Sequence, residues 1–289
     1  MPTNVKLLEE ESDTKISKIL QGYMDEKTAA LAMIAPYQPA KVSPSKRLWA
    51  EIGLEEELNI EDAIYKLKER EAGNLILIVN SFGGGVSSSF KISYALRKNF
   101  VNITVFIPHI AASGGTLIAL SGDDLVMGHM STLTPIDVQM ERGGKMYSVN
   151  AMIRSFSALN DMFKDTSEED APYPWKAMAN KLDPVEFQEW IDASILMEEH
   201  AKTILKMNKS FQKEVNSIIS RLTEGYPTHT YSITLEEAKD IFGTHIHSSN
   251  ESNYKEPWEA ARAWVRRYLN VESANHIVRY VLPKGGKKK

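Results

Sequence analysis

Two glycine-rich turns, one of which carries a serine, are the residues in this sequence best suited to chemistry. The turns are NSFGGG at Asn80–Gly85 and AASGGT at Ala111–Thr116, and the second carries Ser113 between small residues. Each follows a continuous apolar run, Ile76–Val79 or Ile103–Ile107, typical of a strand buried in a parallel sheet. Turns at the carboxyl ends of parallel strands meet at one edge of the sheet, where N–H groups favour negative charge. We therefore expect Ser113 to face donors that can stabilise an oxyanion.

The segments around the turns predict an α/β fold. Between the turns, SSSFKISYALRKNF carries Phe90, Tyr94 and Leu96 at helical spacing, and a third strand step follows at Leu125–Met130. Much further along, Asp183–Arg221 has an amphipathic pattern that predicts one long helix. At 289 residues, 43% of them hydrophobic, the chain is long enough to bury a full core as one large domain.

Composition excludes several classes of protein. The absence of cysteine rules out disulfides, thiolate nucleophiles and cysteine-ligated metals. A formal net charge of −4 does not indicate a nucleic-acid surface. No run of about 18 apolar residues occurs, so we expect no integral membrane segment. The acidic N-terminal stretch lacks the layout of a secretory signal, and we expect a soluble, cytoplasmic protein.

The two turns resemble those of a known superfamily. NSFGGG resembles the NSPGG turn of Clp protease, with Phe82 in place of proline, and AASGG resembles the nucleophile turn of the superfamily that also contains signal peptide peptidase A and the crotonases. The blocks Ile118–Met140 and Pro227–Gly243 are similar to the serine dehydrogenase proteinase family. Together these matches extend the resemblance over residues 31–246.

The resemblance implies a fold and a domain division. The expected fold is a Clp/crotonase-like ββα superhelix with parallel sheets and flanking helices. The expected division is an N-terminal helical extension over residues 1–30, a peptidase domain over 31–250, and a C-terminal helix with a basic tail over 251–289. In the related families, helices like the one expected at Asp183–Arg221 often form an oligomer interface, so we expect a homo-oligomer.

The resemblance also assigns roles to three residues. Ser113 is the nucleophile, and the backbone N–H groups of Gly84 and Gly114 hold the oxyanion. A serine hydroxyl is a weak nucleophile unless a base takes its proton. Each oxyanion donor is worth about 10²–10³ in rate. Glycine suits both donor positions because the backbone must approach the substrate closely and glycine readily adopts a positive φ.

The general base is left open by the sequence. Clp protease carries a histidine downstream of its serine, but the matching region here, LTPIDVQM, has none. Signal peptide peptidases use a lysine whose pKa is lowered by desolvation. In those enzymes the lysine precedes a helix start similar to Leu182–Phe187, which by resemblance makes Lys176 the first candidate, with Lys181 and Lys164 behind it.

Polar residues elsewhere in the matched blocks offer alternatives. His109 and His229 both match family histidines. We expect His109 to shape the nucleophile turn, with a base role as the alternative. We expect His229 to stabilise its own turn, with an approach to the site as the alternative. Asp137 in the PID motif either orients groups in the cleft or caps a turn. His129 follows an apolar strand directly, and we expect a structural role for it.

No metal or cofactor is expected. His245 and His247 form an H-x-H pair, but the sequence offers no third ligand at a useful spacing. No G-x-G-x-x-G follows a strand, so nothing indicates a nucleotide.

The functional hypothesis is a serine peptidase that acts on a peptide or protein substrate by acyl transfer. One alternative is a catalytically silent member of the fold that serves as an assembly or adaptor protein. Another is a crotonase-like acyl-CoA enzyme, which would use the same two amides on a thioester without needing Ser113. A third is a phage or prohead-type maturation protease, which shares both fold and chemistry with the main hypothesis.

Overall fold

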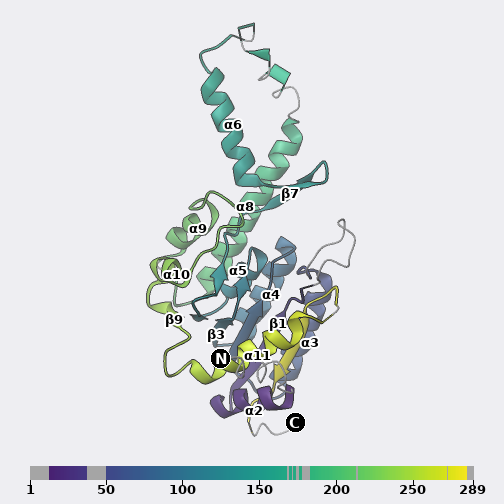
Figure 1. The fold of residues 1–289 in the computed structure, drawn as a ribbon, viewed down its shortest axis with the longest axis vertical. Coiled ribbons are helices and arrows are strands. Elements are labelled where there is room, and N and C mark those ends of the chain that lie inside the picture. The colour runs from purple at the N-terminus through teal and green to yellow at the C-terminus, as the bar shows by residue number, and fades with distance from the viewer. Residues whose placement is uncertain are drawn as a thin grey trace, which may run out of the picture.

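A six-stranded sheet forms the centre of the protein (Figure 1). The computed structural model describes residues 13–37, 50–167, 169–170, 172–173, 176–177, 183–212, 214–271 and 273–284. The sheet order is β10-β1-β2-β3-β5-β9. Its strands are β1 (Thr28–Ile34), β2 (Asn74–Asn80), β3 (Asn102–Ile107), β5 (Asp124–Met127), β9 (Ile246–Ser248) and β10 (Ile277–Val281). Neighbouring strands run parallel except at β10, which pairs antiparallel with β1. The predicted α/β class is confirmed.

Helices bury both faces of this sheet. One face packs against α3 (Leu54–Lys68), α4 (Val86–Asn99) and α5 (Gly114–Ala119), and the other against α2 (Asp13–Tyr23) and α11 (Lys255–Leu269). Within β1, Leu31 and Met33 enter the first core cluster, whereas Ala30 and Ala32 enter the second. Because both faces are covered, the strands are continuously apolar rather than alternating.

Short strands continue the central ones into a second layer. After β3 the chain forms β4 (Ile110–Ala111), and after β5 it forms β6 (Thr132–Leu133), which pairs in parallel with β4. After β2, Ser81 forms a bridge with Ala111. Strands β2, β3 and β5 are thus each followed by a short strand or bridge, and β2 and β3 then by a helix, as in the expected ββα arrangement. The turns that precede α4 and α5 lie in this second layer.

A hairpin and two helices project from the sheet as an arm (Figure 1). The hairpin consists of β7 (Gln139–Arg142) and β8 (Lys145–Ser148), joined by Gly143 and Gly144, which both have positive φ. The arm continues in α6 (Val149–Phe163) and returns in α8 (Pro184–Met207). Figure 1 shows the connection between α6 and α8 at the end of the arm opposite the sheet. No helix in the described ranges is long and apolar enough to span a bilayer.

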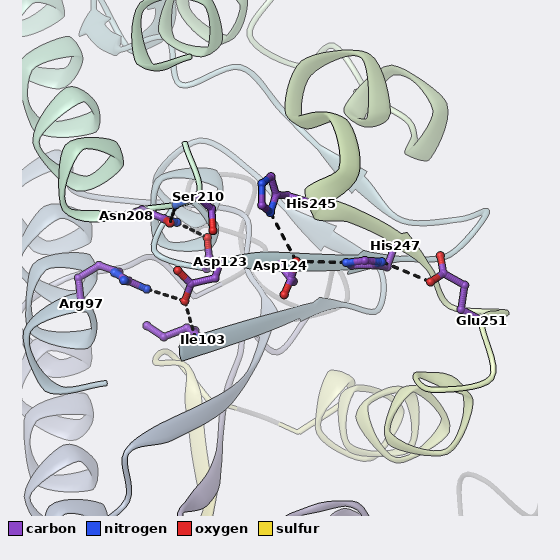
Figure 2. Close-up of polar contacts among 10 residues, drawn as sticks. Arg97, Ile103, Asp123, Asp124, Asn208, Ser210, His245, His247 and Glu251 are labelled. Carbon is purple, nitrogen blue, oxygen red and sulfur yellow. Dashed lines mark hydrogen bonds and ion pairs between the residues drawn. The ribbon is translucent and has the colours of Figure 1, made fainter. Parts of the chain in front are cut away.

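The long helix expected at residues 183–221 is divided in two. After α8 the chain turns at Asn208 before α9 (Val215–Thr223), which packs with α10 (Leu235–Phe242). Asn208 is fully buried, and its side chain donates to the carbonyl of Gly122 and accepts from the N–H of Ser210 (Figure 2). These bonds satisfy a turn inside the core, which the amphipathic pattern alone does not reveal. The 3₁₀ turn η1 (Gly243–His245) then leads into β9.

Candidate active site

Ser113 has an unusual backbone conformation directly before α5. Its φ is 51° and its ψ is −112°, and among the described non-glycine residues only Glu71 also has a positive φ. Such a conformation costs about 1–3 kcal/mol and persists only where the surroundings impose it. Here the N–H of Ser113 donates to Thr134 Oγ1 at 2.9 Å, and its carbonyl accepts from the N–H of Leu117 at 3.0 Å. Nothing but its position in LTPID draws attention to Thr134 in the sequence.

The two glycine-rich turns are in direct contact. A Cβ placed on Gly83 would lie 2.8 Å from the carbonyl oxygen of Ala112 and 3.0 Å from Ser113 Cβ. A Cβ placed on Gly114 would lie 3.4 Å from the amide nitrogen of Gly84. The turns are joined through Ser81, whose N–H donates to Ile110 and whose carbonyl accepts from Ala112. The structure therefore brings Ser113, Gly84 and Gly114 together, as expected from the sequence.

The amides of Gly84 and Gly114 remain available as donors. Ile52 donates to the carbonyl of Gly83 at 2.9 Å and accepts from the N–H of Gly85 at 2.8 Å, so the N–H of Gly84 points away from this bridge. Neither the Gly84 nor the Gly114 N–H has a hydrogen-bond partner within the described residues. A Cβ on Gly84 would lie 2.2 Å from the nitrogen of Ile52, so only glycine fits there. Two unpaired donors beside a serine match the requirements of an oxyanion hole.

A cleft of about 400 Å³ opens in front of Ser113. Its walls come from both turns, the β7–β8 hairpin, α8 and the loop before α10. The lining residues are Glu51, Phe82, Gly83, Gly84, Val86, Ser113, Val138, Gln139, Glu141, Gly144, Met146, Met197 and His229. A larger hollow of about 600 Å³ lies between α9 and α10, but its lining contains neither Ser113 nor a histidine. The chemistry therefore belongs to the smaller cleft.

His229 is the imidazole that lines the cleft together with Ser113. Burial lowers the pKa of His229, and the carboxylate and backbone carbonyl of Asp137 offset part of this shift. The net direction is downward, so the ring is neutral at pH 7 and can accept a proton. The sequence favoured a structural role for His229, whereas its place in the lining of this cleft favours the alternative, an approach to the site.

Asp137 anchors the segment beside His229. Its carboxylate is buried, which raises its pKa, while hydrogen bonds from the Ser148 hydroxyl and the Asn150 N–H act in the opposite direction. Ser148 also caps α6, and Asn150 donates to the carbonyl of Thr223 at 2.7 Å. The start of α6 thus joins Asp137 to the loop that leads to His229.

The two candidate lysines that the structure describes, Lys176 and Lys164, do not reach the cleft within one chain. Lys176 lies in the connection between α6 and α8, where its amine donates to the carbonyl of Glu169 at 3.1 Å. This connection is at the far end of the arm from α5 (Figure 1). Lys164 caps the end of α6 on the same arm, and Lys181 lies outside the described residues. None of the described residues that line the cleft is a lysine.

The remaining histidines lie away from the cleft. His109 and His129 have exposed side chains. His245 and His247 both face Asp124, at 3.6 Å and 3.1 Å, near the start of β5 (Figure 2). In the ranges that the structure describes, no group of three or more His, Cys, Asp or Glu side chains is placed to hold a metal ion.

The family comparison agrees with this geometry. Residues 47–161 match the family model described as ClpP-like SDH-type serine proteinase. The matched range contains both glycine-rich turns and Asp137, and it ends before His229. It confirms the resemblance drawn from the sequence and, at the level of the family, supports a serine peptidase.

Two curated relatives come from Methanocaldococcus jannaschii and are both uncharacterized proteins. MJ1495 is 27% identical over 165 residues, covering 57% of this chain and 49% of the relative. MJ0137 is 27% identical over 175 residues, covering 57% of this chain and 51% of the relative. The chain therefore spans about half the length of the curated relatives it matches.

Several solved structures are similar in outline. The 1510-N membrane-bound stomatin-specific protease has a TM-score of 0.47 at 13% identity, covering 72% of this chain and 80% of that chain. A putative enoyl-CoA hydratase from Streptomyces coelicolor has a TM-score of 0.41 at 14% identity, covering 85% and 71%. ClpP1 from Listeria monocytogenes has a TM-score of 0.40 at 13% identity, covering 83% and 99%. Such low TM-scores do not transfer an activity to this chain.

Proposed function

We propose that this protein is a serine peptidase in which Ser113 is the nucleophile, Gly84 and Gly114 donate to the oxyanion, and His229 is the general base. The observation that carries the proposal is that the proposed nucleophile, base and oxyanion donors meet at one cleft. Ser113, Gly84 and His229 line one cleft, and the Gly114 backbone lies against that of Gly84. A nucleophile, a base and paired donors around one space are the parts that acyl transfer needs.

The proposed reaction proceeds in two steps. Ser113 Oγ attacks the carbonyl carbon of a peptide bond, its proton passes to His229, and the carbonyl oxygen becomes an oxyanion held by the two amides. The C–N bond then breaks, and the leaving amine takes the proton from His229. Water attacks the resulting ester, gives one proton to His229, and releases the acid as that proton returns to Ser113 Oγ.

The environment of His229 suits this role. A base must be unprotonated at the working pH, and burial holds the pKa of His229 below its ordinary value. The imidazolium formed in the reaction is favoured by the Asp137 carboxylate, whose charge already raises the pKa of the ring. Asp137 therefore favours the imidazolium through its charge, while hydrogen bonds from Ser148 and Asn150 hold its carboxylate in place.

Lys176 is the alternative base. Because it lies at the end of the arm, it would act only in the cleft of a second copy of the chain. The arm carries exposed apolar side chains that suit contact between copies, namely Met162, Val185, Ile195 and Leu196. We therefore propose a homo-oligomer that associates through the arm.

Covalent labelling with a fluorophosphonate tests the proposal. The probe should modify the wild-type protein at Ser113, identified by peptide mass spectrometry, and Ser113→Ala should abolish labelling. Ser155→Ala, which removes an exposed hydroxyl on α6, is the matched control and should label normally. His229→Gln should slow labelling, whereas Lys176→Ala should not.

Two outcomes would reject a serine nucleophile. Lack of labelling in the folded wild-type protein would favour a silent assembly protein. Turnover of an acyl-CoA thioester that survives Ser113→Ala would favour the acyl-CoA enzyme instead.

A further inference from the structure

A second serine lies in the first glycine-rich turn, within a buried chain of polar side chains. Ser81 Oγ lies 2.8 Å from His276 Nε2, and His276 Nδ1 lies 3.3 Å from Glu56 Oε1. The exposed fractions are 0% for Ser81, 4% for His276 and 1% for Glu56. The three residues come from the end of β2, the segment before β10 and the first turn of α3. Buried polar side chains are kept in a core only when they are paired.

The direction of each hydrogen bond follows from Glu56. Its carboxylate accepts from the N–H groups of Gly53 at 2.8 Å and His276 at 2.9 Å, as well as from the His276 ring. Burial by itself raises the pKa of Glu56, but these hydrogen bonds bring it below its usual value. An ionised carboxylate only accepts, so His276 Nδ1 donates to it. In the neutral imidazole, Nε2 then accepts from the Ser81 hydroxyl.

At its other end, this series of hydrogen bonds reaches the first glycine-rich turn, Asn80–Gly85, here called the oxyanion turn. The N–H of Gly83 donates to Ser81 Oγ at 3.1 Å, and Gly83 precedes the proposed oxyanion donor Gly84. Gly83 has a φ of +96°, so the turn is held in a conformation that few residues adopt. Ser81 does not line the cleft and is fully buried, so it cannot meet a substrate.

We infer that Glu56, His276 and Ser81 are positioning residues. They fix the conformation of the oxyanion turn from its buried side, so that the segment before β10 completes the active site. The inference rests on the proposed function for the role of Gly84. Each hydrogen bond in this series fixes the side chain that makes the next one, from the Glu56 carboxylate to the Gly83 N–H. His276 is separated from Ser81 by 195 positions in the sequence, so the donor is set only after the C-terminal segment has packed.

Two substitutions of His276 separate this role from general stability. The amide of glutamine reaches the position of Nε2, so His276→Gln keeps an acceptor for Ser81 and loses the donor to Glu56. The amide of asparagine reaches the position of Nδ1, so His276→Asn keeps the donor to Glu56 and loses the acceptor for Ser81. Glu56 retains the two backbone N–H donors in both variants.

Steady-state peptidase kinetics are the first measurement. Ser81→Ala and His276→Asn should lower kcat by about 10²-fold, the effect of misplacing a catalytic group by about 1 Å, with KM nearly unchanged. His276→Gln should stay within a few-fold of the wild type. Ser121→Ala removes another fully buried serine, whose hydroxyl donates only to Ile118, and should leave kcat unchanged. Equal kcat in Ser81→Ala and Ser121→Ala, or equal losses in both His276 variants, would overturn the inference.

Amide hydrogen exchange is the second measurement and does not depend on catalysis. Exchange of the peptide that spans residues 81–85 should become faster in Ser81→Ala and His276→Asn, and should be unchanged in His276→Gln and Ser121→Ala. Unchanged exchange in all four variants would refute the positioning role. If the wild type lacks peptidase activity, the proposed function fails while the exchange measurement still decides whether these residues hold the turn.

Discussion

Replacement of Thr134 by valine tests how the conformation of Ser113 is maintained. Thr134 is 6% exposed, and its hydroxyl accepts from the Ser113 N–H at 2.9 Å. Valine has nearly the same shape, so the substitution removes an acceptor without creating a cavity. An unsatisfied buried donor costs about 1–3 kcal/mol. Because Ser113 is only half-buried and relaxation relieves some backbone strain, we expect a loss of about 1–2 kcal/mol.

The effect on activity should be larger than the effect on stability. Without the bond to Thr134, the positive φ of Ser113 is no longer imposed, and its hydroxyl moves relative to the oxyanion donors. We expect kcat to fall by about 10²-fold, while the Tm falls by about 2–4 °C. Thr134→Ser keeps the hydroxyl and should retain kcat close to that of the wild type.

The assay combines peptidase kinetics with urea and thermal denaturation of the three proteins. The reasoning holds if Thr134→Val has a lower kcat and a lower stability than Thr134→Ser. If Thr134→Val keeps the wild-type kcat, the strained conformation of Ser113 does not depend on this bond. If both variants lose activity equally, the hydroxyl that Thr134→Ser retains is not sufficient, and the loss does not come from this hydrogen bond.

Three further predictions concern the base and the arm. Because burial lowers the pKa of His229, kcat/KM should rise with pH through a midpoint below the ordinary histidine value of about 6.5. A midpoint above that value, or an unchanged profile in His229→Gln, would exclude His229 as the base. Lys176→Ala should retain at least half of the wild-type kcat, and a loss of about 10²-fold or more would make lysine the base instead. Val185→Glu combined with Met162→Glu on the arm should lower the oligomer mass measured by sedimentation. Leu58→Glu, which changes an exposed apolar side chain on α3 outside the arm, should not. An unchanged mass in the double variant would contradict association through the arm.

Local patterns in the sequence were enough to predict the centre of the fold. The apolar runs at 76–79 and 103–107 became β2 and β3, and the helical spacing between them became α4. The place of both turns at the carboxyl ends of parallel strands also predicted that they meet. The structure shows why they carry glycine, because a side chain at Gly84 or Gly114 would collide with its neighbours. These features depend on residues that are near one another in the chain.

Features that depend on distant segments were not predictable in this way. The amphipathic stripe at residues 183–221 looked continuous, yet Asn208 turns the chain because its side chain meets Gly122 from another part of the core. Lys176 was selected by resemblance, because it precedes the helix start at Leu182–Phe187. That position in the sequence carries no information on the direction in which α6 and α8 project.

The sequence by itself determined the nucleophile candidate and the two amides, through the resemblance of its two glycine-rich turns to those of a known family. Only the tertiary structure decided the groups around them. His229 reaches the cleft through the loop after α9, and His276 reaches Ser81 from the segment before β10. The physical reason is that side chains far apart in the sequence meet only when the sheet and its helices have packed, and one-dimensional spacing does not encode that packing.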